Sequence, residues 1–209
     1  LPSILDEEGS AIVQKRLEAR GVNFVLGDCA VRYASGLATL RSGKEVPFDI
    51  LVIAAGVRPN VSLVKEAGGE VNRGIVVNDR QETTIPDVYA AGDNCESYDI
   101  CSGTRRILGL LPNAAFQGET AGRNMAGGDA AFDKAAPFNA LGLFDTHIAT
   151  AGVYEGEAYT DTSEGYKKLF VKDNKLVGFI LIDCIERAGI YTSLIREQTP
   201  LDTVGFELL

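Results

Sequence analysis

Tryptophan is absent from the sequence, and histidine and methionine occur once each among 209 residues. Cysteine is also scarce, with four widely scattered residues and no Cys-x-x-Cys pair. The spacing of these cysteines from His147 excludes a zinc cluster of the usual pattern. Cys95 and Cys101 are close enough in sequence to form a redox pair, but reduced cysteines packed as small apolar side chains are the favoured interpretation.

Long hydrophobic runs and an excess of positive charge are missing too. The longest apolar runs, residues 50–57 and 176–182, are too short to cross a bilayer. The net charge of -9 argues against a polyanion partner, because phosphate backbones recruit lysine and arginine. No signal peptide is recognisable, since three acids follow the first residues at once. We therefore expect a cytoplasmic protein with no nucleic-acid partner and no membrane segment.

The residues that are present, 45% hydrophobic and 23% charged, are ordinary for a globular protein. Apolar periodicity and capping residues predict helices over residues 6–20, 61–67, 113–125 and 186–198. Short apolar or alternating runs predict strands over residues 22–26, 31–33, 37–40, 45–48, 49–55, 74–78, 88–91, 147–153, 166–171 and 176–183. A loop of about a dozen residues is expected before the third helix and a tight turn at Asp173–Asn174. The last helix is expected to bury Ile190, Tyr191, Leu194 and Ile195.

Two of these strands are built to end in small residues. The stretch VYAAGDN, residues 88–94, passes from large apolar residues to Ala-Ala-Gly and then to a carboxylate, and DILVIAAGVRPN, residues 49–60, repeats the change to Ala-Ala-Gly. Ligands of open α/β sheets lie outside the carboxyl ends of strands, where small residues allow close approach. A plain strand capped by an aspartate explains one such stretch alone. Two of them, with Thr84, Pro86 and Asp87 before the second, indicate two adjoining nucleotide sites.

These motifs resemble those of the FAD-dependent pyridine nucleotide-disulfide oxidoreductases. DILVIAAGVRPN is similar to the motif that returns the chain from the NAD(P)H domain to the FAD domain, and ETTIPDVYAAGDN, residues 82–94, is similar to the second FAD motif. The resemblance implies that Asp93 binds the ribityl or pyrophosphate part of FAD and that Gly92 allows close backbone approach. It also implies that Ala55 and Gly56 lie beside the nicotinamide and the flavin.

The same resemblance gives roles to a helix and to the C-terminal part. The helix that opens at Leu111, Pro112, Asn113 and Ala114 would direct its positive dipole end at the flavin pyrimidine ring, although simple core packing also explains it. The stretch KKLFVKDNKLVGFILIDCIERAGIYTSLIREQTPLD, residues 167–202, is similar to the C-terminal domain of NADH oxidases, NADH:rubredoxin reductases and nitrite reductase-like members. In that family this domain forms the dimer interface, so a homodimer is implied.

The implied fold class is α/β, with partial FAD- and NAD(P)-binding Rossmann-like domains followed by a small α+β C-terminal dimerisation domain. We expect residues 1–60 to be the C-terminal half of the NAD(P)H-binding domain, residues 61–129 the C-terminal part of the FAD-binding domain and residues 130–209 the dimerisation domain. One departure from the family stands out: no two glycines lie two positions apart, so neither G-x-G-x-x-G phosphate loop is present. We expect a C-terminal fragment whose phosphate loops come from an upstream segment or a partner chain.

The resemblance implies a portion of a flavoprotein oxidoreductase that passes hydride from NAD(P)H to FAD and electrons on to an acceptor. Dioxygen, rubredoxin, a disulfide and a nitrite-reducing partner are all compatible acceptors. No side chain is assigned as catalytic, His147 included, because the cofactors carry the chemistry. The alternative is a non-catalytic binding or dimerisation module with no bound cofactor, and the isolated chain is expected to be inactive. A visible flavin spectrum distinguishes the two.

Overall fold

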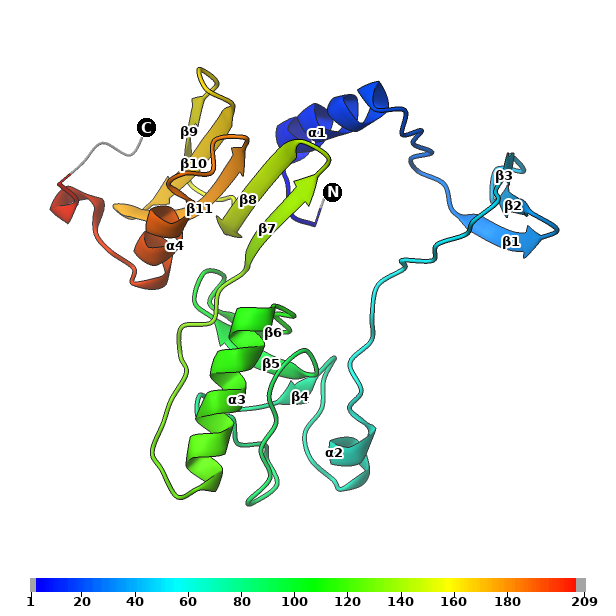
Figure 1. Cartoon of the computed structure of the whole chain (residues 1–209). Coiled ribbons are helices and arrows are strands. Elements are labelled where there is room, and N and C mark those ends of the chain that lie inside the picture. The colour runs from blue at the N-terminus through cyan, green and yellow to red at the C-terminus, as the bar shows by residue number, and fades with distance from the viewer. Residues whose placement is uncertain (1–2, 206–209) are drawn as a thin grey trace. The chain divides into compact units, whose positions relative to one another are not determined.

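The computed structural model describes residues 3–205, which form a mixed α/β protein. Leu1, Pro2 and residues 206–209, which the predicted first and third domains include, lie outside the described part. The described chain divides into two compact units, one formed by residues 3–13 and 58–205 and the other by residues 14–57 (Figure 1). Helix α1 (Glu7–Ala19) begins in the first unit and ends in the second, and it confirms the first predicted helix.

The unit of residues 14–57 contains a small antiparallel sheet. Its strands are β1 (Ala30–Ala34), β2 (Leu37–Leu40) and β3 (Glu45–Pro47), in the order β1-β2-β3. The turns between them use glycines in the left-handed region, with φ of 75° at Gly36 and 87° at Gly43. The predicted antiparallel excursion is therefore confirmed.

Two predicted strands in this unit are wrong. Residues 22–26 and 49–55 have no strand conformation, and the second segment is exposed, with 83% of Ile50 and 80% of Val52 accessible. The apolar pattern predicted a strand buried on both faces of a parallel sheet. Such a strand needs neighbours to pair its backbone and layers to cover both faces, and the described residues provide neither.

The first part of the other unit is built around a three-stranded sheet and one long helix. Strand β4 (Ile75–Val76) pairs in parallel with β5 (Cys95–Asp99), and β5 pairs antiparallel with β6 (Thr104–Arg106). Helices α2 (Ser62–Glu66) and α3 (Leu111–Met125) confirm the second and third predicted helices. The predicted strand 88–91 is wrong, because only an isolated bridge between Glu82 and Tyr89 forms there and the strand begins after Asn94. The predicted loop before α3 instead holds β5 and β6.

The C-terminal part is a five-stranded antiparallel sheet. Its strands are β7 (Phe138–Leu143), β8 (Thr146–Gly152), β9 (Glu157–Asp161), β10 (Tyr166–Lys172) and β11 (Lys175–Ile182), in the order β7-β8-β11-β10-β9. The β10–β11 hairpin turns at Asp173 and Asn174, whose φ values of 49° and 59° confirm the predicted tight turn. Helix α4 (Ala188–Arg196) and the 3-10 turn η1 (Leu201–Thr203) follow.

Helices cover both faces of this sheet. On one face Tyr191, Leu194 and Ile195 of α4 pack into a core with Phe179 and Leu181 of β11. Ile190, which the sequence predicted to be buried with them, is 47% exposed, because it lies on the solvent side of the helix. This core explains why the alternating side chains Phe179 and Leu181 are fully shielded from water.

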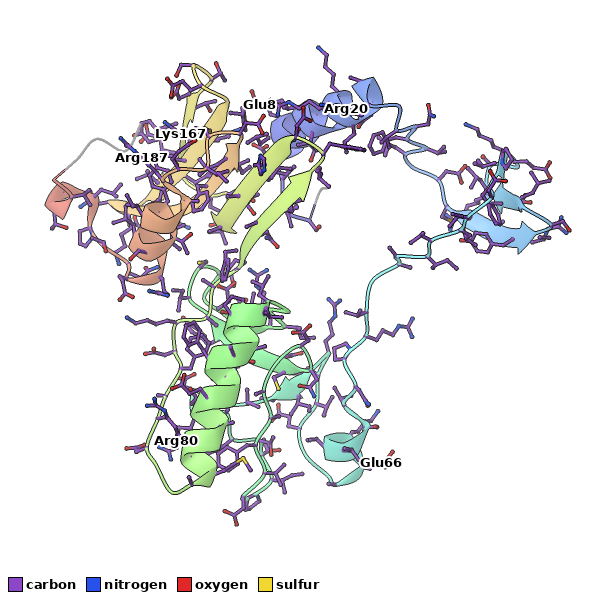
Figure 2. The ribbon with its side chains drawn as sticks, in the orientation of Figure 1. Glu8, Arg20, Glu66, Arg80, Lys167 and Arg187 are labelled. Atoms are coloured by element: carbon purple, nitrogen blue, oxygen red, sulfur yellow. The ribbon has the colours of Figure 1, made fainter. Side chains whose placement is uncertain are left out.

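The opposite face is covered by the start of α1. A Cβ placed on Gly9 would lie 3.6 Å from Cγ2 of Ile180, so the helix backbone rests directly on β11. The hydroxyl of Tyr166 donates to Glu8 over 2.8 Å, and Nζ of Lys168 donates to Asp6 over 2.7 Å. Figure 2 shows Glu8 at this junction between the helix and the sheet. The first turns of α1 are thus part of the C-terminal core.

Candidate functional site

The glycine–aspartate turn at Gly92–Asp93 is the centre of the candidate site. A hairpin leads into it, in which the amide of Thr83 donates to the carbonyl of Val88 and the amide of Ala90 donates to the carbonyl of Gln81. The chain then turns at Gly92, whose φ of 90° is costly for any residue with a Cβ. The amide of Cys95 closes the turn by donating to the carbonyl of Gly92 over 3.1 Å, and β5 begins.

A buried glutamine of α3 fixes this turn. The amide of Gly92 donates to Oε1 of Gln117 over 2.6 Å, and Nε2 of Gln117 donates to Oγ of Ser97 over 2.8 Å. Gln117 is 1% exposed, so both bonds are shielded from water. A single side chain therefore joins the turn, β5 and α3.

The N-terminus of α3 lies beside the turn. A Cβ placed on Gly92 would meet Cβ of Ala114, in the first turn of α3, at 3.7 Å. The cap residue Leu110 provides no side-chain hydrogen bond, and the first turn contains no acid. The amides of Leu111 and Asn113 are therefore left for a partner from outside the helix, and Pro112 has no amide to satisfy. Such an end carries a partial positive charge and attracts anionic or oxygen-rich groups.

The carboxylate of Asp93 stands exposed next to this helix end. A Cβ placed on Gly109 would lie 3.4 Å from both Cγ and Oδ2 of Asp93, so the carboxylate lies directly against the backbone at position 109. Gly92 thus adjoins the first turn of α3 and Asp93 adjoins Gly109 just before it, so the carboxylate and the helix end are neighbours. The arrangement can accept hydrogen bonds at the acid and donate them at the helix.

The structure brings six of the predicted site residues together and leaves two apart. The six residues Gly92, Asp93, Leu111, Pro112, Asn113 and Ala114 lie at the turn and at the start of α3. Within this group Asn113 faces inward, because it is 3% exposed and donates to the carbonyl of Ala136 over 3.1 Å. Ala55 and Gly56 belong to the other compact unit and are exposed. All eight roles stay predictions.

Three residues that matter here were not singled out from the sequence. Gln117, Ser97 and Gly109 position the turn or leave room beside it. The only signal for Gln117 was its place three residues after Ala114 on the same face of a helix. Gly109 could have been found as a glycine shortly before a helix with no cap.

The four cysteines differ in burial. Burial raises the pKa of Cys95 to about 12, and burial together with the charge of Asp99 raises the pKa of Cys101 to about 12. Both thiols are free in the structure, as are Cys29 and Cys184. Among residues 3–205 no group of histidine, cysteine and acid side chains could hold a metal ion. Cys95 is packed as expected and Cys101 and Cys184 are partly buried, whereas the prediction of a packed cysteine is wrong for Cys29, which is exposed.

His147 lies on β8 with an exposed side chain. Its amide donates to Oδ1 of Asp183 over 2.8 Å, and its carbonyl accepts from the amide of Asp183 over the same distance. These are backbone contacts that hold the end of β11, so no chemical role is assigned to the imidazole. No helix in the described part of the chain is long and apolar enough to cross a membrane.

Comparison with known proteins places the chain in a family. The family described as pyridine nucleotide-disulphide oxidoreductase matches residues 1–118. The chain belongs to this family. The rubredoxin NAD+ reductase C-terminal domain matches residues 137–199. Both matches confirm the resemblance drawn from the motifs, and family membership implies FAD and NAD(P)H as cofactors of the parent enzyme.

The relatives include several flavoprotein and nicotinamide-dependent proteins. The chain is 30% identical to the assimilatory nitrate reductase electron transfer subunit of Bacillus subtilis, over 93% of this chain and 26% of that protein. It is 31% identical to an NADH oxidase of Methanocaldococcus jannaschii, over 85% of this chain and 45% of that protein. An NAD-dependent persulfide reductase from A. fulgidus superposes with a TM-score of 0.88 at 25% identity, over 100% of this chain and 44% of that one. The chain thus spans half or less of these relatives.

Proposed function

We propose that this chain forms the flavin-facing part of an FAD-dependent NAD(P)H oxidoreductase. The observation that carries the proposal is the Gly92–Asp93 turn, held by Gln117 against the uncapped N-terminus of α3. The exposed carboxylate of Asp93 and the N-terminus of α3, which has no side-chain cap, both adjoin this turn. The family match and the relatives named for NADH oxidase and rubredoxin reduction support it.

The residues present fit the cofactor. Asp93 would accept hydrogen bonds from ribityl hydroxyls, and the first amides of α3 would donate to the polar edge of the flavin ring. Gly92 and Gly109 bring the backbone close to the start of α3 and to the carboxylate of Asp93. FAD, when bound, takes hydride from NAD(P)H and passes electrons on. The protein's own task here is to bind and orient, and none of its side chains needs to move a proton.

The phosphate-binding part of the site lies outside this sequence. No G-x-G occurs in it, so the loops that would cradle the two pyrophosphates come from an upstream segment or a partner chain. The exposed apolar stretch around Ile50 and Val52 has the composition of a buried parallel strand and would pair with such a segment. Ala55 and Gly56 at its end would then lie beside the nicotinamide and the flavin.

The acceptor and the assembly are further parts of the proposal. The relatives are named for several reactions, among them NADH oxidase, NADH-rubredoxin oxidoreductase and nitrite reductase. Dioxygen, rubredoxin, a disulfide and a nitrite-reducing partner remain candidate acceptors for this protein. We also propose a cytoplasmic homodimer, supported by the match of residues 137–199 to the rubredoxin reductase C-terminal domain.

A comparison of three nucleotides tests the proposal on the 209-residue chain. FAD, FMN and ADP are each titrated while the flavin absorbance or the protein heat signal is followed. Because Asp93 and α3 face the ribityl and flavin moieties, FMN should bind within about threefold of FAD and ADP should not compete. No binding of either flavin, or binding that ADP displaces, would contradict the proposed site. If neither flavin binds, the alternative of a dimerisation module without a cofactor is favoured.

A further inference from the structure

A groove of about 500 Å³ lies between the first half of α3, the linker that follows it and the end of α4. Its apolar lining consists of Pro112, Phe116, Ala131, Phe132, Ala136 and Phe138. The volume falls within the range of small-molecule sites, which are typically concave and mainly apolar. The groove shares Pro112 and Asn113 with the start of α3, and Phe138 also packs against the core of the sheet, while Phe116 and the linker residues 131–136 belong to neither.

The linker that forms one wall of the groove is held in place by hydrogen bonds to its backbone. The side-chain amide of Asn124 donates to the carbonyl of Ala130 over 2.9 Å, and the amide of Ala130 donates back over 2.8 Å. The amide of Phe132 donates to the carbonyl of Asp79 over 2.8 Å. The amide of Ile100 donates to the carbonyl of Ala135 over 3.0 Å. Figure 2 shows Arg80 beside the end of α3, where its carbonyl accepts from Asn124. The wall is therefore preformed.

Two aromatic rings line the groove and are stacked on each other. The ring centroids of Phe116 and Phe132 lie 5.4 Å apart with an interplanar angle of 29°. Phe116 is nevertheless 45% exposed, which is a large accessible area for a phenylalanine in a recess. An exposed aromatic surface of this kind offers offset stacking to a flat ring.

The charges at the rim of the groove largely neutralise one another. The carboxylate of Glu197 accepts from Nζ of Lys134 and, over 3.3 Å, from Nε of Arg196. The contacts with these two cations hold the pKa of Glu197 below its usual range. Asp133, which also lines the groove, adds a negative charge. An anionic ligand would thus meet cations that already have a partner and an acid that repels it.

We infer that this groove binds a neutral, planar aromatic molecule of one or two fused rings. The apolar lining and the stacked phenylalanines favour a ligand with a flat ring. The volume of the groove limits the size of the ligand, and the paired charges at the rim favour an uncharged ligand. Nucleotides and coenzyme A derivatives are disfavoured because their phosphates find no free cation. The inference concerns binding alone and does not depend on flavin binding.

The test is a titration of the ¹⁵N-labelled chain with 2,3-dimethyl-1,4-naphthoquinone, a quinone that does not add to thiols. We expect a dissociation constant on the order of 0.1 mM, as befits a small ligand, with shifts concentrated at the amides of residues 113–116, 131–136 and 138. Phe132→Ala and Phe116→Ala should each weaken binding about tenfold, because stacking on either ring is lost. Phe144→Ala is the matched control, since Phe144 is exposed and lies outside the groove.

The results of these titrations either support or overturn the proposed ligand site. Quinone shifts at the groove that both groove variants diminish and the Phe144→Ala control retains support it. No binding to a wild-type chain with a dispersed spectrum overturns it, as does binding that both groove variants leave unchanged. A 1,4-naphthoquinone-2-sulfonate probe should bind several-fold more weakly than the neutral quinone. Tighter binding of this anion would overturn the assignment of a neutral ligand.

Discussion

The backbone amide of Gly92 donates a hydrogen bond to the side-chain carbonyl of Gln117, with 2.6 Å between the two atoms. The bond joins the Gly92–Asp93 turn to α3, whose N-terminus lies beside the turn and has no side-chain cap. Because Gln117 is almost fully buried, water cannot replace the bond if it breaks. The geometry of the candidate cofactor site therefore depends on a residue that would not itself touch the cofactor.

Replacing Gln117 by alanine should destabilise the chain by about 2–4 kcal/mol. The change leaves the amide of Gly92 and the hydroxyl of Ser97 without their partner, and it creates a cavity between α3 and the residues packed against it. Urea unfolding followed by circular dichroism measures the effect. The control is Glu119→Gln on the exposed side of the same helix, which should change stability by about 0.5 kcal/mol or less. Equal effects of the two changes would refute the structural role of Gln117.

Replacing Gly92 and Gly118 by alanine should change the free energy of unfolding in opposite directions. Gly92→Ala should destabilise by about 1–2 kcal/mol, because φ at this position is 90°, although the space for a methyl group is adequate. Gly118→Ala, within α3 and with nothing within 4 Å of the added Cβ, should stabilise by about 0.5–1 kcal/mol. The same urea experiment measures both. A stabilised Gly92→Ala variant would show that the turn does not adopt the described conformation.

Acidification should weaken the contact between α1 and the C-terminal sheet. The hydrogen bond from Tyr166, followed by that from Lys168, lowers the pKa of Glu8 below its usual value of 4.5. A carboxyl with a lowered pKa in the folded state contributes stability above its unfolded pKa and loses this contribution as the pH falls through the folded value. The stability difference between wild type and Glu8→Gln should thus be present at pH 7 and decline below about pH 4.5.

The size of this effect should be modest, about 0.5 kcal/mol, because Glu8 is largely exposed to solvent. The comparison variant is Glu7→Gln, an exposed acid in the same helical turn. Unfolding in urea is measured for all three proteins at several pH values between 3 and 7. A difference between wild type and Glu8→Gln that does not vary with pH would exclude the proposed linkage.

The four cysteines should be modified by a thiol reagent at different rates at pH 8. Burial raises the pKa of Cys95 and of Cys101 to about 12, so both thiols stay protonated and poorly reactive at this pH. Burial also raises the pKa of Cys184, while Cys29 is exposed. Labelling followed by peptide mass analysis should find Cys29 modified first and Cys95 and Cys101 modified only after unfolding. Rapid native labelling of Cys101 would contradict the described packing.

Elements with a strong local signal were predicted well. Helix α3 was found within two residues of its start, because Pro112 marks its first turn and two glycines follow its end. The β10–β11 hairpin was found for a similar local reason, since Asp173 and Asn174 readily adopt positive φ. The family motifs also led to the turn at Gly92 and Asp93, where the structure places the helix end.

Elements that depend on remote partners were predicted poorly. The apolar run of residues 49–55 is typical of a buried strand in a parallel sheet, but the pattern does not indicate whether a neighbouring strand is present to pair with it. Strand β9 was missed because it lies at the sheet edge with mostly exposed side chains and no alternation. The burial of Gly9 against Ile180 was also beyond local reasoning, because the contact joins distant parts of the chain.

The affinity of the chain for FAD before and after Asp93→Asn tests the central claim most directly. Absorbance titration at the flavin band measures both, with Asp87→Asn, an exposed acid on the same hairpin, as the control. The account predicts that Asp93→Asn weakens FAD binding about tenfold, because hydrogen bonds to an ionised acceptor are lost, while Asp87→Asn leaves it unchanged. Equal affinity of wild type and Asp93→Asn, or equal losses in both variants, would contradict the assignment of this turn to the flavin.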